Sequence, residues 1–464
     1  MAKALWGAPF CYSRYGAQAL RLYEVRVCGG TRAGRAIPHV PVFFVDRCLS
    51  VTTSFFAAFQ VKGYRWLLGN AFATSAAWTV EGIAQGWLVL ELTDSPFWVG
   101  AVVGVRGTFQ LLFSMLGGTL ADRWDRRAIL LANYCMASVM ALLLGLLIFS
   151  HAIQVWHLFI AAALNGAIGA ANGPAYNALS YDVLGPQRLL NGTAFRFMAG
   201  AAIRVLSALA GGFIIELLGM GPNYVVVSGA YLLSAACLLP LRSPERSAVT
   251  KREHPLSALA GGLRYAGKTR PVRELLLLSL ATEAFGFSWM YMKPVMARDV
   301  LQVGALGLGY LEAAAAAGQL LAMVGVASLG DFRHKGWLLL GSTFGYGVSI
   351  VLFGLSPWFG VSLALSAMAG GTGGMYDSSM NTVMLMTTTA EMRGRVLGLY
   401  VATWGSNQVG GFLLGALGTV VGVPLALAMT GSVVAANAAR LVRSVRVFTP
   451  EAKAAAPDPP GEGT

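Results

Sequence analysis

Apolar stretches, each close to the length that crosses a lipid bilayer, follow one another through most of this sequence. A helix needs about 20 apolar residues to span the hydrocarbon core. Such stretches occupy about residues 66–92, 97–120, 128–150, 153–178, 190–217, 223–240, 274–297, 304–328, 336–355, 358–386, 396–418 and 422–440. Apolar residues make up 56% of the chain and charged residues only 12%, a balance typical of membrane proteins. We therefore predict an all-α membrane protein with twelve transmembrane helices.

The charged residues between these stretches indicate the orientation in the membrane. Lys and Arg concentrate in short cytoplasmic loops, and a dense run of them, Asp122-Arg123-Trp124-Asp125-Arg126-Arg127, separates the second and third stretches. If both termini are cytoplasmic, the inner segments hold 29 of the 34 basic residues. We expect a multi-pass protein of the cell membrane with both termini inside. Contact with anionic lipid then explains the net charge of +13 without nucleic acid.

A weak internal repeat at an offset of 204 residues divides the chain into halves. Residues 165–169 (NGAIG) align with 369–373 (AGGTG), and 99–101 (VGA) align with 303–305 (VGA). Two pseudo-symmetric six-helix bundles with a substrate cavity between them are the transporter architecture that such a repeat predicts. The domains expected are an amino-terminal extension (1–62), a first bundle (63–240), a cytoplasmic linker (241–273), a second bundle (274–445) and a disordered tail (446–464).

The extension fits no membrane span. It is rich in Arg and superficially resembles an organellar transit peptide, but we favour a disordered segment or a start codon assigned too early. Five scattered cysteines without a Cys-x-x-Cys pair predict neither a disulfide framework nor a metal site.

The loop after the second stretch carries a family resemblance. Gly118-Thr-Leu-Ala-Asp122-Arg123-Trp-Asp125-Arg126-Arg127 resembles the Gly-x-x-x-Asp-Arg-x-Gly-Arg-Arg signature of the major facilitator superfamily, with Asp125 in place of the second Gly. Residues 90–100 (LELTDSPFWVG), 105–107 (VRG) and 391–396 (EMRGRV) are similar to the bacterial branch that includes the enterobactin exporter and macrolide-efflux proteins. Ser207-Ala208 stands where many drug antiporters of the superfamily have Gly-Pro. The resemblance implies a monomeric transporter without cofactor or enzymatic activity, whose partners are a small-molecule substrate, protons and the bilayer.

The same resemblance implies a cytoplasmic gate. In the family the loop carboxylate and guanidinium groups are thought to hold the halves together, which here would involve Asp122, Arg123, Arg126 and Arg127. We expect partners in Asp182 or Glu391 across the interface, because carboxylates pair well with guanidinium groups. The alternative is that these charges only fix the topology.

Charged residues inside the predicted spans are costly in hydrocarbon and are therefore candidates for function. The predicted substrate or proton pathway consists of Glu81, Arg106, Arg204, Glu283, Glu312 and Asp377, with Arg196 nearer a span end. The two arginines could neutralise Glu81 or an anionic substrate, and the three carboxylates of the second half could carry a proton. Static ion pairs are the alternative for each of them.

Aromatic and Met residues recur in the same spans and suit a cavity for a bulky, partly apolar ligand. Trp78, Trp289 and Tyr376 are the candidates, although such residues also pack helices together. One further pattern, Gly262-Leu-Arg-Tyr-Ala-Gly267-Lys268-Thr269, fits a phosphate-binding loop. No strand is predicted before it and a membrane span follows, so we expect no nucleotide site there.

These features predict a secondary transporter that exports a bulky amphipathic small molecule of drug or siderophore type, by proton antiport and alternating access. An importer of a metabolite or lipid with the same fold is the alternative, because the residues do not encode direction. A receptor or scaffold without transport is a third possibility.

Overall fold

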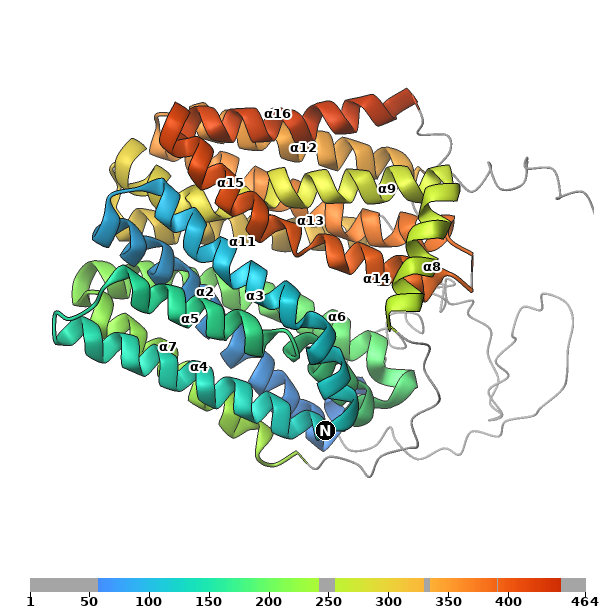
Figure 1. The fold of residues 1–464 in the computed structure, drawn as a ribbon, viewed down its shortest axis with the longest axis horizontal. Coiled ribbons are helices and arrows are strands. Elements are labelled where there is room, and N and C mark those ends of the chain that lie inside the picture. The colour runs from blue at the N-terminus through green and yellow to red at the C-terminus, as the bar shows by residue number, and fades with distance from the viewer. Residues whose placement is uncertain (1–56, 242–254, 329–333, 390, 444–464) are drawn as a thin grey trace, which may run out of the picture. The chain divides into compact units, whose positions relative to one another are not determined.

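The computed structural model describes residues 57–241, 255–328, 334–389 and 391–443, although the side chains of residues 57–58, 115–123, 190 and 255–259 are not described. Within these ranges the chain is helical (Figure 1). After the short η1 (Ala57–Gln60), the first group of helices comprises α2 (Lys62–Thr93), α3 (Pro96–Arg123), α4 (Arg126–Phe149), α5 (Val155–Gly169), α6 (Asn172–Leu218) and α7 (Met220–Leu238).

A second group follows the connecting helix α8 (Pro255–Lys268). It comprises α9 (Arg270–Ala281), η2 (Thr282–Gly286), η3 (Phe287–Met292), α10 (Lys293–Val295), η4 (Met296–Val300), α11 (Gly304–Ser328), α12 (Lys335–Leu355), α13 (Phe359–Thr387), α14 (Arg393–Thr403), α15 (Ser406–Val421) and α16 (Val423–Leu441). Eight segments of the described chain are long and apolar enough to cross a membrane, which supports a multi-pass protein. The count of twelve stays a prediction.

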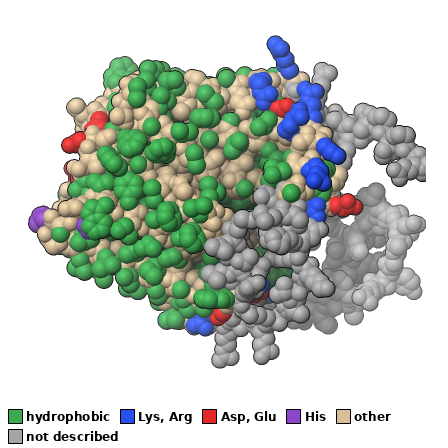
Figure 2. All heavy atoms as spheres, in the orientation of Figure 1, with side chains coloured by type: hydrophobic (Ala, Val, Ile, Leu, Met, Phe, Trp, Pro, Cys, Tyr) green, Lys and Arg blue, Asp and Glu red, His purple; other side chains and the backbone are tan. Residues whose placement is uncertain are grey.

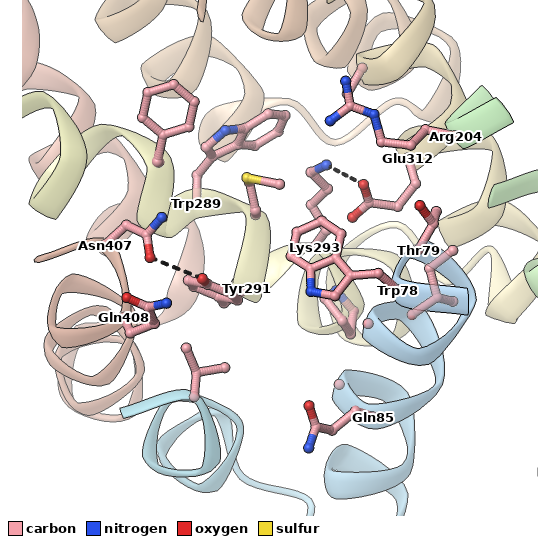
Figure 3. Close-up of a pocket in the computed structure, with 18 of the residues that line it drawn as sticks. Trp78, Thr79, Gln85, Arg204, Trp289, Tyr291, Lys293, Glu312, Asn407 and Gln408 are labelled. Carbon is pink, nitrogen blue, oxygen red and sulfur yellow. Dashed lines mark hydrogen bonds and ion pairs between the residues drawn. The ribbon is translucent and has the colours of Figure 1, made fainter. Parts of the chain in front are cut away.

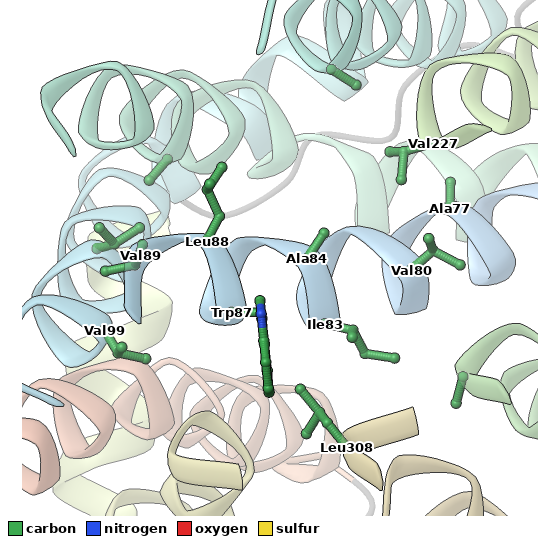
Figure 4. Packing of buried hydrophobic residues seen from close by; sticks show 14 of the residues in the cluster. Ala77, Val80, Ile83, Ala84, Trp87, Leu88, Val89, Val99, Val227 and Leu308 are labelled. Atoms are coloured by element: carbon green, nitrogen blue, oxygen red, sulfur yellow. The ribbon is translucent and has the colours of Figure 1, made fainter. Parts of the chain in front are cut away.

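The surface and the interior are both apolar, as expected of helices surrounded by lipid. Apolar side chains cover most of the face shown in Figure 2, and Lys and Arg side chains gather at the end formed by α8 and α14. Inside, α2 packs against α6 and α7, and α3 packs against α5. Figure 4 shows Ala84 and Leu88 on one side of α2, while Ile83 and Trp87 on the other side face Leu308 of α11. The helix α2 therefore has a packing partner in each group.

The predicted spans differ in regularity. The fourth is broken, because α5 ends at Gly169 and α6 begins at Asn172. A further kink lies within α6 at Gly185, the residue before Pro186. Its φ of 68° is in the left-handed region that glycine adopts readily. The seventh span is the most irregular, since α9 passes into the π-helical η2, the 3₁₀-helical η3 and the π-helical η4. Such irregular turns inside helices are frequent at functional sites.

The connecting helix α8 also bears on the phosphate-loop pattern. Residues 262–268 lie within α8, so the stretch that matches the pattern is a helix rather than a glycine-rich loop after a strand. Helical backbone directs its N–H groups along the helix axis and cannot wrap around a phosphate. This geometry agrees with the expectation that no nucleotide binds there.

Close packing of α11 against α13 gives a test of this fold. A Cβ atom added at Gly318 would lie 1.9 Å from the carbonyl oxygen of Ala367, whereas one at Gly325 of the same helix would meet nothing within 4 Å. We expect Gly318→Ala to lower stability by about 1–3 kcal/mol, as overpacking does. Gly325→Ala, the control, should leave it unchanged or raise it, because Ala favours helix. Thermal unfolding of both purified variants measures the difference; equal melting temperatures would contradict this packing.

Candidate substrate cavity

A cavity of about 690 Å³ lies between the two groups of helices (Figure 3). The first group contributes residues of α2, α3, α5 and α6 to its wall. The second contributes residues of η2, η3, α10, α11, α12, α13 and α15, together with Trp404 between α14 and α15. This volume is within the range of sites that enclose small organic ligands.

An ion pair between Lys293 and Glu312 forms part of the second-group wall. Lys293 Nζ donates to Glu312 Oε2 at 2.8 Å and lies 4.4 Å from the ring centre of Trp289. The Lys293 side chain is 1% exposed, and that of Glu312 is 21% exposed. The carboxylate of Glu312 and the ring of Trp289 therefore compensate the burial of the Lys293 ammonium group. Lys293 is not among the residues predicted from the sequence. It is nevertheless a charged residue inside the predicted span 274–297, which is the property that made Glu283 a candidate.

The two arginines predicted for the pathway lie on the first-group wall. Arg204 on α6 donates from Nη2 to Gln319 Oε1 of α11 at 2.6 Å, so it reaches across to the second group. Its buried Nε has no hydrogen-bond partner. Arg106 on α3 also lines the cavity, and the described residues give it no hydrogen bond or ion pair.

Two carboxylates line the opposite wall. Glu283 lies in the π-helical η2 and is 3% exposed, and Asp377 lies on α13. Neither carboxylate has an ion-pair partner among the residues that the structure describes. Among the charged lining residues without an ion-pair partner, the cationic ones thus lie on the first-group wall and the acidic ones on the second-group wall.

Glu81, the remaining carboxylate of the predicted pathway, does not line the cavity. It is buried on α2, where Oε1 accepts a hydrogen bond from Asn165 Nδ2 at 3.1 Å and Oε2 accepts one from the Tyr231 hydroxyl at 2.5 Å. All three residues belong to the first group, and Asn165 also borders the cavity. Both carboxylate oxygens of Glu81 are hydrogen-bonded, and these bonds connect α2 to α5 and α7.

The three aromatic candidates have different surroundings. Trp78 lines the cavity and is 48% exposed. Trp289 also borders the cavity but is buried, and its Nε1 donates to the Tyr346 hydroxyl at 3.1 Å. Tyr376 is fully buried, is not among the lining residues, and packs near Phe287.

Several contacts join the two groups at the end of the bundle that contains Asp94, here named the Asp94 end. Arg298 of η4 donates from Nη1 to Asp94 Oδ1 at 2.8 Å and to the Leu90 carbonyl at 2.9 Å. Glu216 of α6 accepts a hydrogen bond from Ala305 N at the start of α11, at 3.2 Å. Close approach of α3 to α15 adds to these polar contacts.

The opposite end, named the Arg126 end, contains the residues predicted to form the gate. Arg126 forms an ion pair with Asp182, and both belong to the first group. Arg127 Nη2 donates to the Leu239 carbonyl at 2.7 Å, and Asp125 Oδ1 caps α4 by accepting from Arg127 N at 3.1 Å. Glu391 is exposed between α13 and α14. The side chains of Asp122 and Arg123 lie outside the described residues.

No group of three or more His, Cys, Asp and Glu side chains that could hold a metal ion occurs among the described residues.

Two groups of membrane helices around a central charged cavity are the arrangement of the major facilitator fold. Two solved structures share it: a bacterial homolog of the human lysosomal transporter Spinster, in an inward-facing and unoccupied conformation (TM-score 0.67, 16% identity, 83% of this chain and 97% of that one), and the nucleoside transporter NupG (TM-score 0.59, 14% identity, 83% and 99%).

A family model described as "Transmembrane secretion effector" (MFS_3) matches residues 53–460. The chain belongs to this family of the major facilitator superfamily, which confirms the resemblance seen in the sequence. The enterobactin exporter EntS of Escherichia coli O1:K1 / APEC is 29% identical over 354 residues, covering 73% of this chain and 81% of that protein. EntS of Shigella boydii serotype 18 shows the same 29% identity over 354 residues. These relatives are transporters and not enzymes.

The Lys293–Glu312 pair gives a test of the cavity wall. We expect Glu312→Leu to cost about 3–5 kcal/mol of stability, because it leaves a fully buried ammonium group without a carboxylate. Lys293→Met should cost less, since the carboxylate that it leaves without a partner is partly exposed, at 21%, and is therefore less desolvated than the ammonium group. The double variant should recover most of the loss. Thermal unfolding of the three variants checks this order, and additive losses in the double variant would show that the residues are not coupled.

Proposed function

We propose that this protein exports a bulky amphipathic small molecule across the cell membrane in exchange for protons. The observation that carries the proposal is the cavity between the two helix groups, whose wall combines aromatic side chains with charged ones. An aromatic and apolar lining suits the body of such a molecule, and charged groups suit its polar end and the proton. The similarity to enterobactin exporters supports the outward direction.

Alternating access follows from where the helix groups meet. The contacts of Arg298 and Glu216 hold the groups together at the Asp94 end, whereas the ion pair of Arg126 stays within one group. The charge pattern of the loops supports a cytoplasmic Arg126 end. We infer that this arrangement faces the cytoplasm, and that substrate release requires the Asp94 end to open.

The gate at the Arg126 end remains part of this proposal. When the Asp94 end opens, the groups approach each other at the Arg126 end, where Asp122, Arg123, Arg126, Arg127 and Glu391 become available to hold them. Guanidinium groups and carboxylates make the strongest hydrogen bonds of this kind. Glu283 and Asp377 are the proposed proton carriers, because each faces the cavity without an ion-pair partner among the described residues.

Transport in everted membrane vesicles tests export and coupling together. With enterobactin and erythromycin as labelled probes, we expect an imposed pH gradient, acidic inside, to drive uptake of at least one of them, and an uncoupler to abolish it. Vesicles without the protein provide the background. Uptake that ignores the gradient would exclude proton exchange, and absence of uptake for both probes would leave no support for drug or siderophore export.

The same vesicles test the gate. Asp122→Asn should slow uptake about tenfold or more at an unchanged protein level, because it removes the charge from a hydrogen bond worth about 1.5–3 kcal/mol. Normal uptake in this variant would show that the loop charges only determine topology.

Opening at the Asp94 end can be measured directly. Arg298→Glu places two carboxylates opposite each other and should separate the groups, while Asp94→Arg with Arg298→Asp should restore the attraction. Spin labels at Leu92 and Gln302, one in each group, report the separation by pulsed electron paramagnetic resonance. We expect longer distances in Arg298→Glu and the original distribution in the exchanged pair. An unchanged distribution in both would mean that this contact does not hold the groups together.

A further inference from the structure

The charged groups of the cavity are unequally compensated. Six charged side chains line it, and Lys293 and Glu312 neutralise each other. Arg106 and Arg204 remain on the first-group wall, and Glu283 and Asp377 remain on the second. The described residues supply none of these four with an ion-pair partner within 4.0 Å.

Carboxylate and guanidinium groups behave differently in a buried cavity. A carboxylate in a poorly hydrated site can become neutral by binding a proton, but a guanidinium group stays charged at any physiological pH. The positive charge of the first-group wall is therefore permanent, while the negative charge of the facing wall can be lost. A cavity with this distribution of charge favours a ligand that brings negative charge.

Arg204 has the geometry to bind such a group. One of its terminal nitrogens is occupied by the neutral amide oxygen of Gln319, at 2.6 Å. Its Nε is buried and has no hydrogen-bond partner. A guanidinium group has five N–H donors arranged to match a carboxylate or a phosphate, so most of the donor capacity of Arg204 is free for a ligand.

The surroundings of Arg204 suggest what the anion is attached to. Figure 3 shows Trp78 and Thr79 of α2 on the same side of the cavity as Arg204. Trp78 lines the cavity and is 48% exposed, so a large part of its side chain is accessible. An aromatic ring on the same side of a cavity as a guanidinium group is suited to a ligand that has both a planar apolar part and an anionic group.

We propose that Arg204, assisted by Arg106, binds the anionic group of the transported molecule, and that the substrate class is organic anions whose aromatic body lies against Trp78. This inference rests on the proposed function, since it takes the cavity to be the substrate site. The negative interior of a cell favours the exit of an anion, so this charge agrees with export.

Three molecules of nearly equal shape and different charge test the proposal. They are 1-naphthoate (anionic), 1-naphthalenemethanol (neutral) and 1-naphthylmethylammonium (cationic). Binding of labelled 1-naphthoate to the full chain in phosphatidylcholine nanodiscs, and competition by the other two, gives three dissociation constants. We expect 1-naphthoate to bind at least about tenfold more tightly than either analogue, the size of effect that one charge-assisted hydrogen bond produces. Equal or tighter binding of the ammonium compound would overturn the proposal.

Variants locate the binding site. Arg204→Gln should weaken 1-naphthoate binding at least about tenfold and leave the neutral analogue unaffected, whereas Arg204→Lys should lose less, because it keeps the charge without the forked geometry. The matched control is Arg196→Gln. Arg196 is on the same helix but lies over the rings of Tyr176 and Phe197, at 4.8 and 4.5 Å, and does not line the cavity. Equal losses at Arg196 and Arg204 would show that no specific anion site exists. If Arg204→Gln does not fold, Arg204→Lys and Arg106→Gln decide, and unchanged binding in both would overturn the proposal.

The binding test and the export test can fail independently of each other. Selective binding of 1-naphthoate without uptake of any probe into vesicles would keep the anion site and remove the proposed export. Proton-driven uptake of erythromycin together with preferred binding of the ammonium compound would keep export and exclude an anionic substrate.

Discussion

The high free-energy cost of an uncompensated charge in a lipid bilayer governs most of this structure. Where charge is not needed, apolar side chains cover the helices, as Figure 2 shows for one face of the molecule. Where charge occurs in a span, the protein either compensates it or places it at the cavity. Glu81 is satisfied by Asn165 and Tyr231, and Lys293 is paired with Glu312. Arg106, Arg204, Glu283 and Asp377 are the charges that the cavity exposes instead.

The cavity depends on irregular helices as much as on charged residues. The seventh span leaves regular α-helical geometry at Thr282 and passes through η2, η3 and η4. The turns η2 and η3 place Glu283 and Trp289 in the lining, and the short α10 that follows them places Lys293 there. A regular helix repeats its direction every 3.6 residues, so a change of helix type alters which residues share a face. Backbone irregularity of this kind is tolerated in a membrane where it is buried in protein or lines a cavity.

The family of this protein and the charge class of its substrate rest on different observations. The family match and the similarity to enterobactin exporters establish a transporter of the major facilitator superfamily. They do not specify what this chain carries, and the solved structures of the same fold include a nucleoside transporter. The charge class of the substrate is instead argued from Arg204 and its unused hydrogen-bond donors.

The sequence by itself determined the class of protein, because the length of the apolar stretches and the loop signature at Asp122 are local properties that need no knowledge of distant contacts. It also identified most charged residues of the cavity, since a charge inside an apolar stretch is visible in one dimension. Only the tertiary structure decided how those charges are used. Glu81 and Asp377 look alike in the sequence, yet one is satisfied within its own helix group and the other faces the cavity. That difference arises from residues more than eighty positions away, such as Asn165 and Tyr231, whose proximity only the packing of helices creates.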